Sequence, residues 1–406
     1  MNSKINGLAL FFLVSICSFA PKVEAKFLKG LYHTVEETYN LLDDWVQRCS
    51  YHLKRESIES NGKEMDYYSL EETKGSNAPV TLFIFGEHSR ESITTELAIF
   101  FIKSICSPDS KYDKETKKAI MAQNKFILIP IVNVPGKILV EKGNYCKRTN
   151  ENGVDLNRNW DSHWKGSNKE DETYPGRKAF SEWQTNFIKN IMEKHKPRTF
   201  MSLHSGVIGL YIPFAYKKVN INLTKDREID KLRDMIVILN NVNKKYCHCN
   251  TGPAANELWY LCPGTCLDYA FEEINIPYTF AAEIFDGISK DDAYSKIIEQ
   301  DKIEPFRYSE FRSQFNKFGI FLQKREGFNK KLYIRNEYGW DMKKASCFSQ
   351  TSMTLISEEP TDEENEQCAK QFNPLTEKLY NNTLVLWTNI IFEIVSNVAF
   401  NEKNNK

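Results

Sequence analysis

Three side chains that could bind a metal follow two buried apolar segments of the chain. His88 and Glu91 come directly after the run Val80–Phe85, and His204 closes the run Phe200–Leu203. A histidine and a glutamate three residues apart at such a turn can place two ligands on one side of a metal, and a third ligand holds zinc while leaving a position for water. His33-x-x-Glu36 has the same spacing but follows no strand, so we interpret His33 as a surface histidine.

Two further segments carry polar groups suited to binding and proton transfer. The stretch Gly153–Asn159 (GVDLNRN) places Arg158 beside asparagine amides, an arrangement that can hold an anionic group. Tyr260, Asp268 and Glu283 follow in order, and Glu283 comes near the end of an apolar run. A carboxylate at that edge of a sheet is a candidate general base.

The elements that must position these residues alternate between strands and helices. Four apolar runs of strand length are rich in β-branched and aromatic residues, and longer segments between or after them have helical character. The expected strands are Val80–Phe85, Phe126–Val132, Thr199–Leu203 and Tyr278–Ile284, and the expected helices are Ser92–Cys106, Ser181–His195, Lys225–Tyr246 and Thr376–Phe400. Ser181-x-x-Gln184 resembles a capping box at the start of the second helix. Because the strands lack period-two alternation, we predict one α/β domain, a mixed, mostly parallel β-sheet with helices on both faces.

The predicted domain covers residues 26–400, and one part of it lacks the alternation of strands and helices. From about 287 to 367 the chain is charged and irregular, and we interpret it as an insertion that ends in an acidic solvated loop. Lys+Arg and Asp+Glu both number 54, so the net charge is zero and bulk charge gives no reason to expect nucleic-acid binding. The final apolar run, 384–400, contains Asn389 and Glu393, which predicts a packed terminal helix and no membrane span.

The first 25 residues have the pattern of an export signal. A positively charged residue, Lys4, precedes an apolar stretch from Leu8 to Ala20 and a small-residue cleavage site that ends at Ala25. We therefore expect a secretory-pathway protein, either secreted or lysosomal or vacuolar. Sequons at Asn222 and Asn381 agree with glycosylation in that pathway.

Nine cysteines remain once the signal has been removed. An oxidising compartment favours disulfides, and the odd number predicts one free thiol or an intermolecular bridge. Four of them could instead hold a structural zinc. The nine are Cys49, Cys106, Cys146, Cys247, Cys249, Cys262, Cys266, Cys347 and Cys368, and the four are Cys247, Cys249, Cys262 and Cys266.

Four motifs together resemble the zinc metallocarboxypeptidases of the carboxypeptidase A and B type. They are Glu87–Glu91 (EHSRE), Gly153–Trp160 (GVDLNRNW), Leu203–Gly206 (LHSG) and the ordered set Tyr260, Asp268 and Glu283. The resemblance extends from about Lys29 to the terminal helix and includes Tyr174–Ser181 and Cys368–Pro374. It implies the zinc carboxypeptidase fold and one Zn²⁺ per chain.

The resemblance also implies a role for each matching residue. His88, Glu91 and His204 match the zinc ligands, and Glu283 matches the base that deprotonates the attacking water. The remaining matches are Asn157, Arg158 and Tyr260 for the grip on the substrate carboxylate, Asp155 for the carboxylate that orients a ligand imidazole, and Arg90 for an accessory substrate-binding arginine.

The resemblance also implies a residue that stabilises the oxyanion, for which two positions compete, and a residue on the floor of the specificity pocket. The arginine that polarises the scissile carbonyl in the family corresponds to Arg148 or, one register earlier, to Lys147, and we favour Arg148 because a planar guanidinium suits an oxyanion. The residue on the floor of the specificity pocket corresponds to Leu267, which favours an apolar or aromatic terminal side chain.

The resemblance predicts a zinc-dependent exopeptidase that removes single C-terminal residues from peptides and proteins. We expect a monomer that acts on peptide or protein C-termini. Between Ala25 and His88 the chain is too short for a separate inhibitory domain, so we expect no need for proteolytic activation. The alternatives are a zinc amidase or deacylase acting on small acyl-amino acids, an enzyme that trims tubulin, and a catalytically silent binding module of the same fold.

Overall fold

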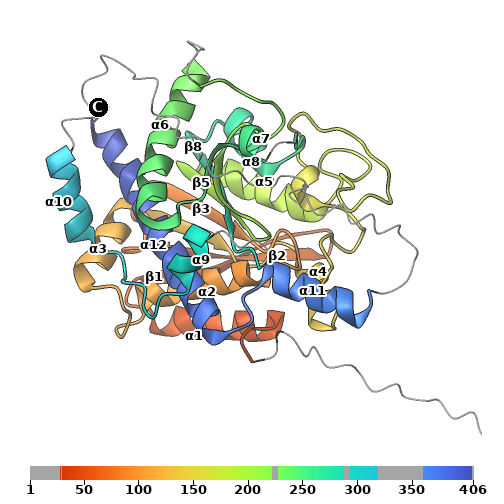
Figure 1. Cartoon of the computed structure of the whole chain (residues 1–406), viewed down its shortest axis with the longest axis horizontal. Helices are drawn as coiled ribbons and strands as arrows, with labels where there is room; N and C mark the ends of the chain where they lie inside the picture. The colour runs from red at the N-terminus through yellow and green to blue at the C-terminus, as the bar shows by residue number, and fades with distance from the viewer. Residues whose placement is uncertain are drawn as a thin grey trace, which may run out of the picture.

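The computed structural model describes residues 28, 30–221, 227–258, 260–287, 292–318 and 360–404 (Figure 1). The expected export signal, the Asn222 sequon and Cys347 lie outside these residues. Within them, the expected sheet with helices on both faces is present.

Eight strands form one mixed sheet in the order β1-β2-β4-β3-β5-β8-β6-β7. The central pairs β4–β3, β3–β5 and β5–β8 are parallel, as is β6–β7, whereas β1–β2, β2–β4 and β8–β6 are antiparallel. The strands are β1 (His52–Ser60), β2 (Lys63–Glu71), β3 (Val80–Phe85), β4 (Lys125–Ile129), β5 (Thr199–His204), β6 (Ile208–Ile212), β7 (Asn250–Pro253) and β8 (Tyr278–Ile284).

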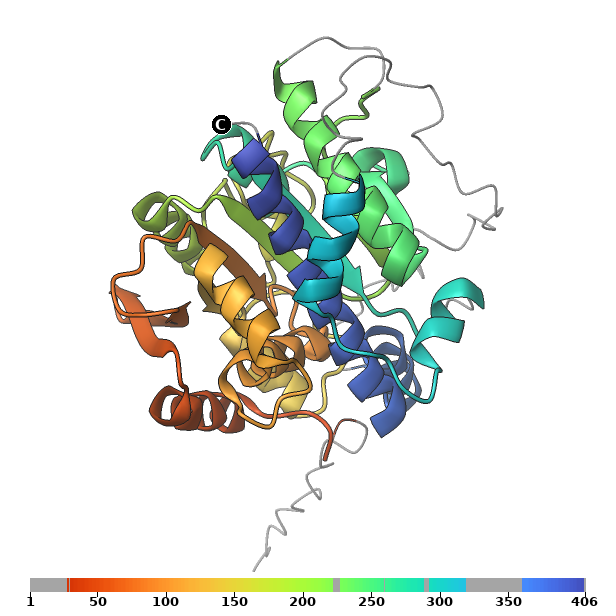
Figure 2. The same ribbon diagram turned by 90° about the vertical axis from the view of Figure 1, so that its left-hand side faces the viewer.

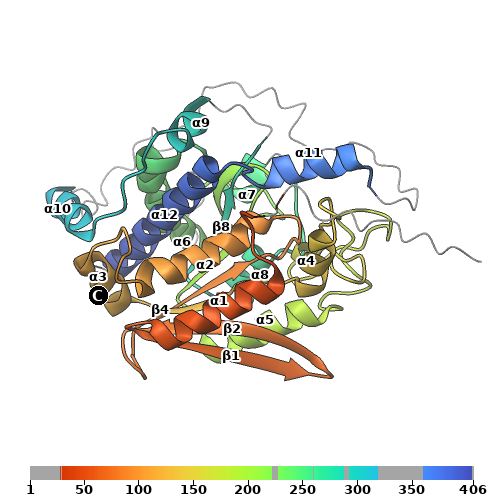
Figure 3. The same ribbon diagram turned by 90° about the horizontal axis from the view of Figure 1, so that it is seen from below.

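The helices cover both faces of this sheet (Figures 2 and 3). Successive residues of β3 point to opposite faces of the sheet. Phe83 and Phe85 pack in the core with α2 and α12, whereas Leu82 and Ile84 pack in the core with α5 and α8. The helices are α1 (Val35–Arg48), α2 (Ser92–Cys106), α3 (Lys114–Gln123), α4 (Val134–Glu141), α5 (Trp183–His195), α6 (Arg227–Val242), α7 (Ala254–Glu257), α8 (Cys266–Glu272), α9 (Asp292–Ile298), α10 (Tyr308–Phe318), α11 (Asp362–Phe372) and α12 (Glu377–Asn404). A strand with both faces buried must be apolar throughout, which explains the absence of period-two alternation.

The predicted elements agree with the structure in place and type, with one error at a helix start. Strands β3 and β8 and helix α2 have the predicted bounds. The capping box expected at Ser181 is wrong, because α5 begins at Trp183 with Glu182 as its N-cap and has no side-chain cap bond. Ser181 instead donates its hydroxyl to the Glu182 carboxylate.

The described parts of the charged segment 287–367 are largely helical, which its composition did not suggest. Helices α9 and α10 lie within its first part, and α11 begins at Asp362. Three of the acidic residues that we interpreted as a solvated loop, Asp362, Glu363 and Glu364, form the first turn of α11, where Thr361 closes a capping box with Glu364. Negative side chains favour this position because the amino end of a helix carries partial positive charge.

Three disulfides join distant or adjacent parts of the described chain. Cys49–Cys106 links the ends of α1 and α2, Cys146–Cys368 links the segment before the GVDLNRN motif to α11, and Cys247–Cys249 closes a short loop after α6. Cys262 and Cys266 are reduced and buried. The described residues therefore hold two free thiols where one was expected, and the four-cysteine zinc alternative is wrong because Cys247 and Cys249 are bonded to each other.

The terminal apolar run forms the buried helix α12, as predicted. Among the described residues, one helical stretch, Asp362–Asn401, has the length and composition of a membrane span, but 94% of its apolar window is buried inside the protein. Helix α12 packs against α2, α3 and α6 (Figure 3). Its hydropathy is therefore explained by a place in the core.

Candidate metal centre

The three predicted ligands converge at the carboxyl end of the parallel strands. His88 and Glu91 lie between β3 and α2, and His204 ends β5. His88 Nδ1 lies 2.8 Å from Glu91 Oε1, and His204 Nδ1 lies 3.2 Å from both His88 Nδ1 and Glu91 Oε2. All three side chains are buried. One ligand atom from each lies within 4.8 Å of the others, which is the spacing of a metal site.

Local backbone chemistry directs His88 and Glu91 inward. Gly86 turns the chain at φ +63°, and a Cβ there would press on the Thr95 hydroxyl. Thr94 Oγ1 accepts from Gly86 N and donates to Glu91 O, which ties the turn to the first residues of α2. Glu91 is the N-cap of α2 but makes no side-chain cap bond, because its carboxylate faces the two histidines.

The outer nitrogens of both rings have polar partners, which leaves Nδ1 of each ring facing the cluster. His88 Nε2 lies 3.1 Å from Asp155 Oδ1, and His204 Nε2 lies 2.6 Å from Ser202 Oγ. A ring that donates from Nε2 presents an unprotonated Nδ1 for coordination. The donor set of two imidazoles and one carboxylate therefore fits a catalytic zinc ion.

The pKa values at the cluster follow from its packed charges. Burial lowers the pKa of His204, but the hydrogen bond to Glu91 and the charges of Glu91, Glu283 and Glu87 outweigh burial and raise it to about 9. Burial raises the pKa of Glu91, but the two histidines reverse this effect and hold the pKa below its usual value. A proton and a metal would compete for this histidine, so metal binding is expected to release protons.

Arg148, and not Lys147, faces the ligand cluster. Its Nε and Nη2 donate to Asp155 Oδ2 at 3.0 and 2.8 Å, and its Nη1 lies 3.1 Å from His88 Nδ1. Arg148 is 2% exposed. Lys147 is half-buried, and burial lowers the pKa of its amine despite the opposing charge of Glu151.

Asn157 and Arg158 lie beside the cluster on a short 3-10 turn, Leu156–Arg158, that Asp155 caps by accepting from Asn157 N. Asn157 Nδ2 lies 3.4 Å from His204 Nε2, and Asn157 Oδ1 accepts from Cys266 N. Arg158 is nearly buried and donates to Asn157 O. The amide and the guanidinium therefore belong to the same site as the three ligands.

Glu283 is the neighbour of His204 across the sheet. Strands β5 and β8 are parallel, and His204 pairs with Glu283 in their register. Paired residues of adjacent strands project from the same face, so the Glu283 carboxylate stands beside the ligand. Its charge also contributes to the raised pKa of His204.

Leu267 and Tyr260 belong to a small apolar cluster next to the site. Leu267 is buried with partly buried Tyr260 packed against the same group, which also includes Tyr211, Ala215, Ala254, Cys262, Leu258 and Ala281. The carboxylate of Asp268, the residue after Leu267, accepts from the backbone N–H groups of Ala215 and Tyr216. Burial raises the pKa of Asp268 to about 7, although these hydrogen bonds oppose the change.

Arg90, the expected accessory substrate-binding arginine, is tied to segments around the ligand cluster. Its guanidinium forms an ion pair with Glu172, donates to Cys146 O and stacks over the Phe372 ring at 4.2 Å. The residue is 5% exposed, and burial lowers its pKa, with the charge of Arg148 adding to this effect and the charges of Glu172 and Glu91 opposing it. Its part in substrate binding stays a prediction.

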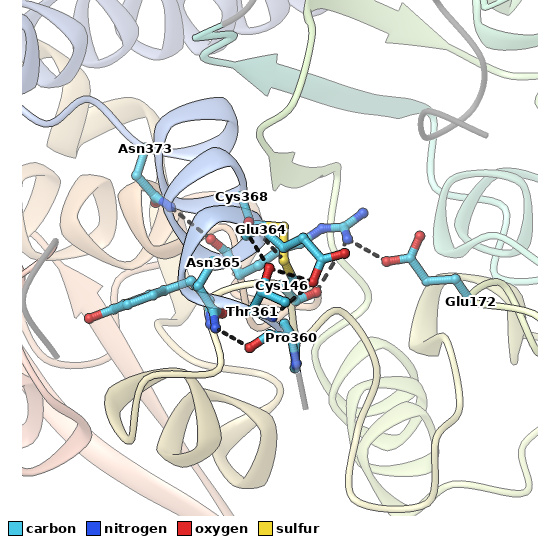
Figure 4. The surroundings of a disulfide bond; sticks show 10 residues. Cys146, Glu172, Pro360, Thr361, Glu364, Asn365, Cys368 and Asn373 are labelled. Atoms are coloured by element: carbon cyan, nitrogen blue, oxygen red, sulfur yellow. Dashed lines mark hydrogen bonds and ion pairs between the residues drawn. A yellow bond between two sulfur atoms is a disulfide. The ribbon is translucent and has the colours of Figure 1, made fainter. Parts of the chain in front are cut away.

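The end of α11 lies against both ligand segments, and Figure 4 shows the Cys146–Cys368 disulfide and Asn373 at this place. Asn373 accepts from Ile93 N at 3.0 Å and donates to Arg90 O at 2.9 Å, so it holds the turn that carries His88 and Glu91. Phe372 O accepts from the Ser205 hydroxyl, next to His204. The Cys146–Cys368 disulfide fixes α11 to the segment that carries Arg148.

Sequence reasoning gave no role to three polar residues around the ligands: Ser202 and, within quoted motifs, Glu87 and Asn373. Ser202 carried a usable signal, because residues i and i+2 of a strand share a face and Ser202 must lie beside His204. No local sequence signal identified Glu87 or Asn373, because their partners are distant in sequence.

The fold and this ligand set define a metal-binding α/β protein of the hydrolase type, and comparisons with known proteins identify its family. Residues 38–310 match the zinc carboxypeptidase family, so the chain belongs to it. Carboxypeptidase A2 of Mus musculus is 27% identical over 272 residues, covering 63% of this chain and 63% of the relative. Carboxypeptidase A1 of Homo sapiens is 28% identical over 277 residues, covering 64% of each chain. The chain therefore spans less than two thirds of the length of these relatives.

Solved structures of the same family share the fold. Thrombin activatable fibrinolysis inhibitor aligns with a TM-score of 0.54 at 22% identity, covering 63% of this chain and 66% of that one. Carboxypeptidase A from Helicoverpa armigera aligns with a TM-score of 0.52 at 19% identity, covering 62% and 64%. These likenesses support the zinc carboxypeptidase fold predicted from the motifs.

Proposed function

We propose that this protein is a zinc-dependent exopeptidase that removes single C-terminal residues from peptides and proteins. The observation that carries the proposal is the buried convergence of His88, Glu91 and His204, with Glu283 in register beside His204. Family membership supports a zinc ion at this site.

The surrounding residues have complementary tasks in the proposed reaction. Bound zinc supplies Lewis-acid chemistry, which polarises the peptide carbonyl and lowers the pKa of a water molecule. Glu283 takes the proton of the attacking water and returns it to the leaving amine. Arg148 meets the negative charge that develops on the carbonyl oxygen. Asp155 holds His88 through Nε2 and so keeps Nδ1 directed at the metal.

A clamp for a free carboxylate explains why cleavage is confined to the last peptide bond. Asn157 and Arg158 offer an amide and a guanidinium beside the ligands, and Tyr260 lies in the adjoining apolar cluster. A guanidinium and a carboxylate form strong, directional hydrogen bonds. A substrate without a terminal carboxylate lacks this contact, so its amide should be a poor substrate.

The pocket beside the clamp favours an apolar or aromatic C-terminal residue. Leu267 and its neighbours form an apolar cluster, and the carboxylate of Asp268 accepts from two backbone N–H groups. A leucine at this position, in place of a charged residue, gives no reason to prefer Lys, Arg, Asp or Glu.

We further propose a monomeric enzyme of the secretory pathway, with a signal at residues 1–25 and a catalytic domain at 26–400. Three disulfides among the described residues support an oxidising compartment. Secreted and lysosomal or vacuolar destinations both agree with this.

A mass-spectrometric time course on the purified mature protein tests the function. Peptides that differ only in their last residue are supplied as free acids and as C-terminal amides, with and without a zinc chelator. We expect single-residue shortening of the acids alone, abolished by the chelator and by Glu283→Gln. A zinc-loaded wild-type protein that leaves every peptide intact would contradict the proposal, and small acyl-amino acids would then be tested as substrates.

A further inference from the structure

A second buried carboxylate, which the proposed reaction does not use, lies behind the zinc-ligand cluster. Glu87 precedes His88 and is 1% exposed. Its Oε1 accepts from Trp160 Nε1 at 3.1 Å, and its Oε2 lies 3.6 Å from Cys266 Sγ and 3.5 Å from His204 Nε2. Burial of a carboxylate costs free energy unless it accepts hydrogen bonds, and Trp160 and Cys266 supply such bonds to Glu87.

These donors form a chain that begins at the ligand His204. To bind a metal through Nδ1, the neutral ring must carry its proton on Nε2, and Ser202 Oγ lies 2.6 Å from that nitrogen. Burial raises the pKa of the Cys266 thiol and a hydrogen bond from Ser202 opposes this rise, while the thiol donates to Glu87 Oε2, the oxygen that itself lies 3.5 Å from His204 Nε2. Ser202 and Cys266 are fully buried, so water does not compete for these bonds.

The direction of donation is the same at each step. Nε2–H donates to Ser202, Ser202 to Cys266, and Cys266 to Glu87, which accepts at the end of the chain. Trp160 donates to the other oxygen and holds the carboxylate in place. Hydrogen bonds that point the same way strengthen one another in a dry interior.

This arrangement matches the one on the other histidine. Asp155 accepts directly from His88 Nε2 and is itself held by Arg148. Each ligand ring therefore has a buried carboxylate on the side away from the metal. Groups that orient a ligand ring contribute to metal affinity as well as to geometry.

We infer that Glu87, acting through Cys266 and Ser202, is a positioning residue that holds the His204 ring with Nδ1 toward the zinc ion. The inference rests on the proposed zinc site, but it does not depend on which substrate the enzyme cleaves. Loss of the acceptor leaves the Ser202 hydroxyl and the His204 ring free to turn. The consequence is weaker zinc binding, together with slower turnover.

Zinc affinity, measured by competition with a chromogenic chelator, tests the inference apart from catalysis. Glu87→Gln replaces an acceptor oxygen by an N–H donor, and we expect it to weaken zinc binding by roughly 10- to 100-fold. Ser202→Ala removes the middle of the chain and should weaken binding in the same direction. Glu96→Gln is the matched control, because Glu96 is an equally buried carboxylate that bonds His33 and Tyr380, away from the site.

Thermal melting of the metal-free variants separates positioning from folding. We expect Glu87→Gln to lose zinc affinity well beyond any loss shared with Glu96→Gln. Wild-type zinc affinity in a folded Glu87→Gln variant would overturn the inference. If Glu87→Gln does not fold, Cys266→Ala decides, because it removes the donor to Glu87 and leaves Ser202 beside His204: reduced affinity supports the inference and wild-type affinity refutes it. A wild-type protein that binds zinc but cleaves no peptide refutes the proposed function only.

Discussion

Arg148 offers the sharpest test of the proposed mechanism, because the adjacent Lys147 is a ready comparison. Arg148 is buried, bonds Asp155 through two nitrogens and directs the third to within 3.1 Å of His88 Nδ1 and 3.8 Å of Glu91 Oε1. Lys147 is half-buried. If the guanidinium stabilises the charge that develops on the carbonyl oxygen, only Arg148 should be needed for turnover.

The size of the effect follows from the contacts. Removal of one donor to a developing oxyanion lowers kcat by about 10²- to 10³-fold, equivalent to about 3–4 kcal/mol. Arg148→Lys keeps the charge but cannot bond Asp155 with two nitrogens while reaching the substrate. We expect a fall in kcat of this size with little change in KM, since the interaction forms in the transition state. Loss of one of the two bonds to Asp155 should also lower stability, by up to the roughly 3–5 kcal/mol of a broken buried ion pair.

Steady-state hydrolysis of a peptide with a C-terminal phenylalanine, with zinc content and melting temperature measured in parallel, provides the assay. Lys147→Met should retain turnover within a few-fold of wild type. Zinc-loaded, folded Arg148→Lys with wild-type kcat would refute the assignment. A loss confined to Lys147→Met would transfer the role to the lysine.

Three further predictions concern specificity, pH and the disulfides. Leu267→Asp should weaken hydrolysis of apolar-ended peptides by roughly 10- to 100-fold and favour Lys- or Arg-ended ones, measured as kcat/KM on matched peptides; an unchanged preference would exclude Leu267 from the pocket. Burial, with the nearby lysine, lowers the pKa of His195 from 6.5 to about 4, so the unfolded chain binds more protons between these values and stability should fall as pH drops from about 6.5 to 4. Because the ring is only partly buried, we expect an effect of about 1 kcal/mol, and urea unfolding of His195→Phe should show a flatter pH profile. Replacing Cys146 and Cys368 by serine should destabilise the protein by up to about 5 kcal/mol and speed zinc loss, whereas removing the disulfide between α1 and α2 should affect stability alone.

Much of the site could be predicted because its ligands follow local rules. His88 and His204 come at the ends of strands that are apolar on both faces, and such ends meet at one edge of a parallel sheet. The register of β5 against β8 brings Glu283 beside His204, and it cannot be predicted from either segment alone. It follows from the packing of the sheet between two layers of helices.

Other features depended on contacts that no local pattern encodes. The choice between Arg148 and Lys147 is set by Asp155, seven residues beyond Arg148, and by a disulfide to α11. Glu87 meets Cys266 across 179 residues of sequence. The acidic residues in the first turn of α11 were misinterpreted as a loop because a helix start and a solvated loop favour the same side chains.

The brace supplied by α11 also sets an order of events during synthesis. His88, Glu91 and His204 leave the ribosome long before Cys368, Phe372 and Asn373, which hold the ligand turns from behind. A nascent chain therefore carries all three ligands without the support that fixes them. In the secretory compartment proposed above, the site becomes complete only when the late segment has docked and the Cys146–Cys368 pair has been oxidised. The proposed peptidase activity would then begin only after most of the chain has folded, and unfinished copies of the enzyme would be spared.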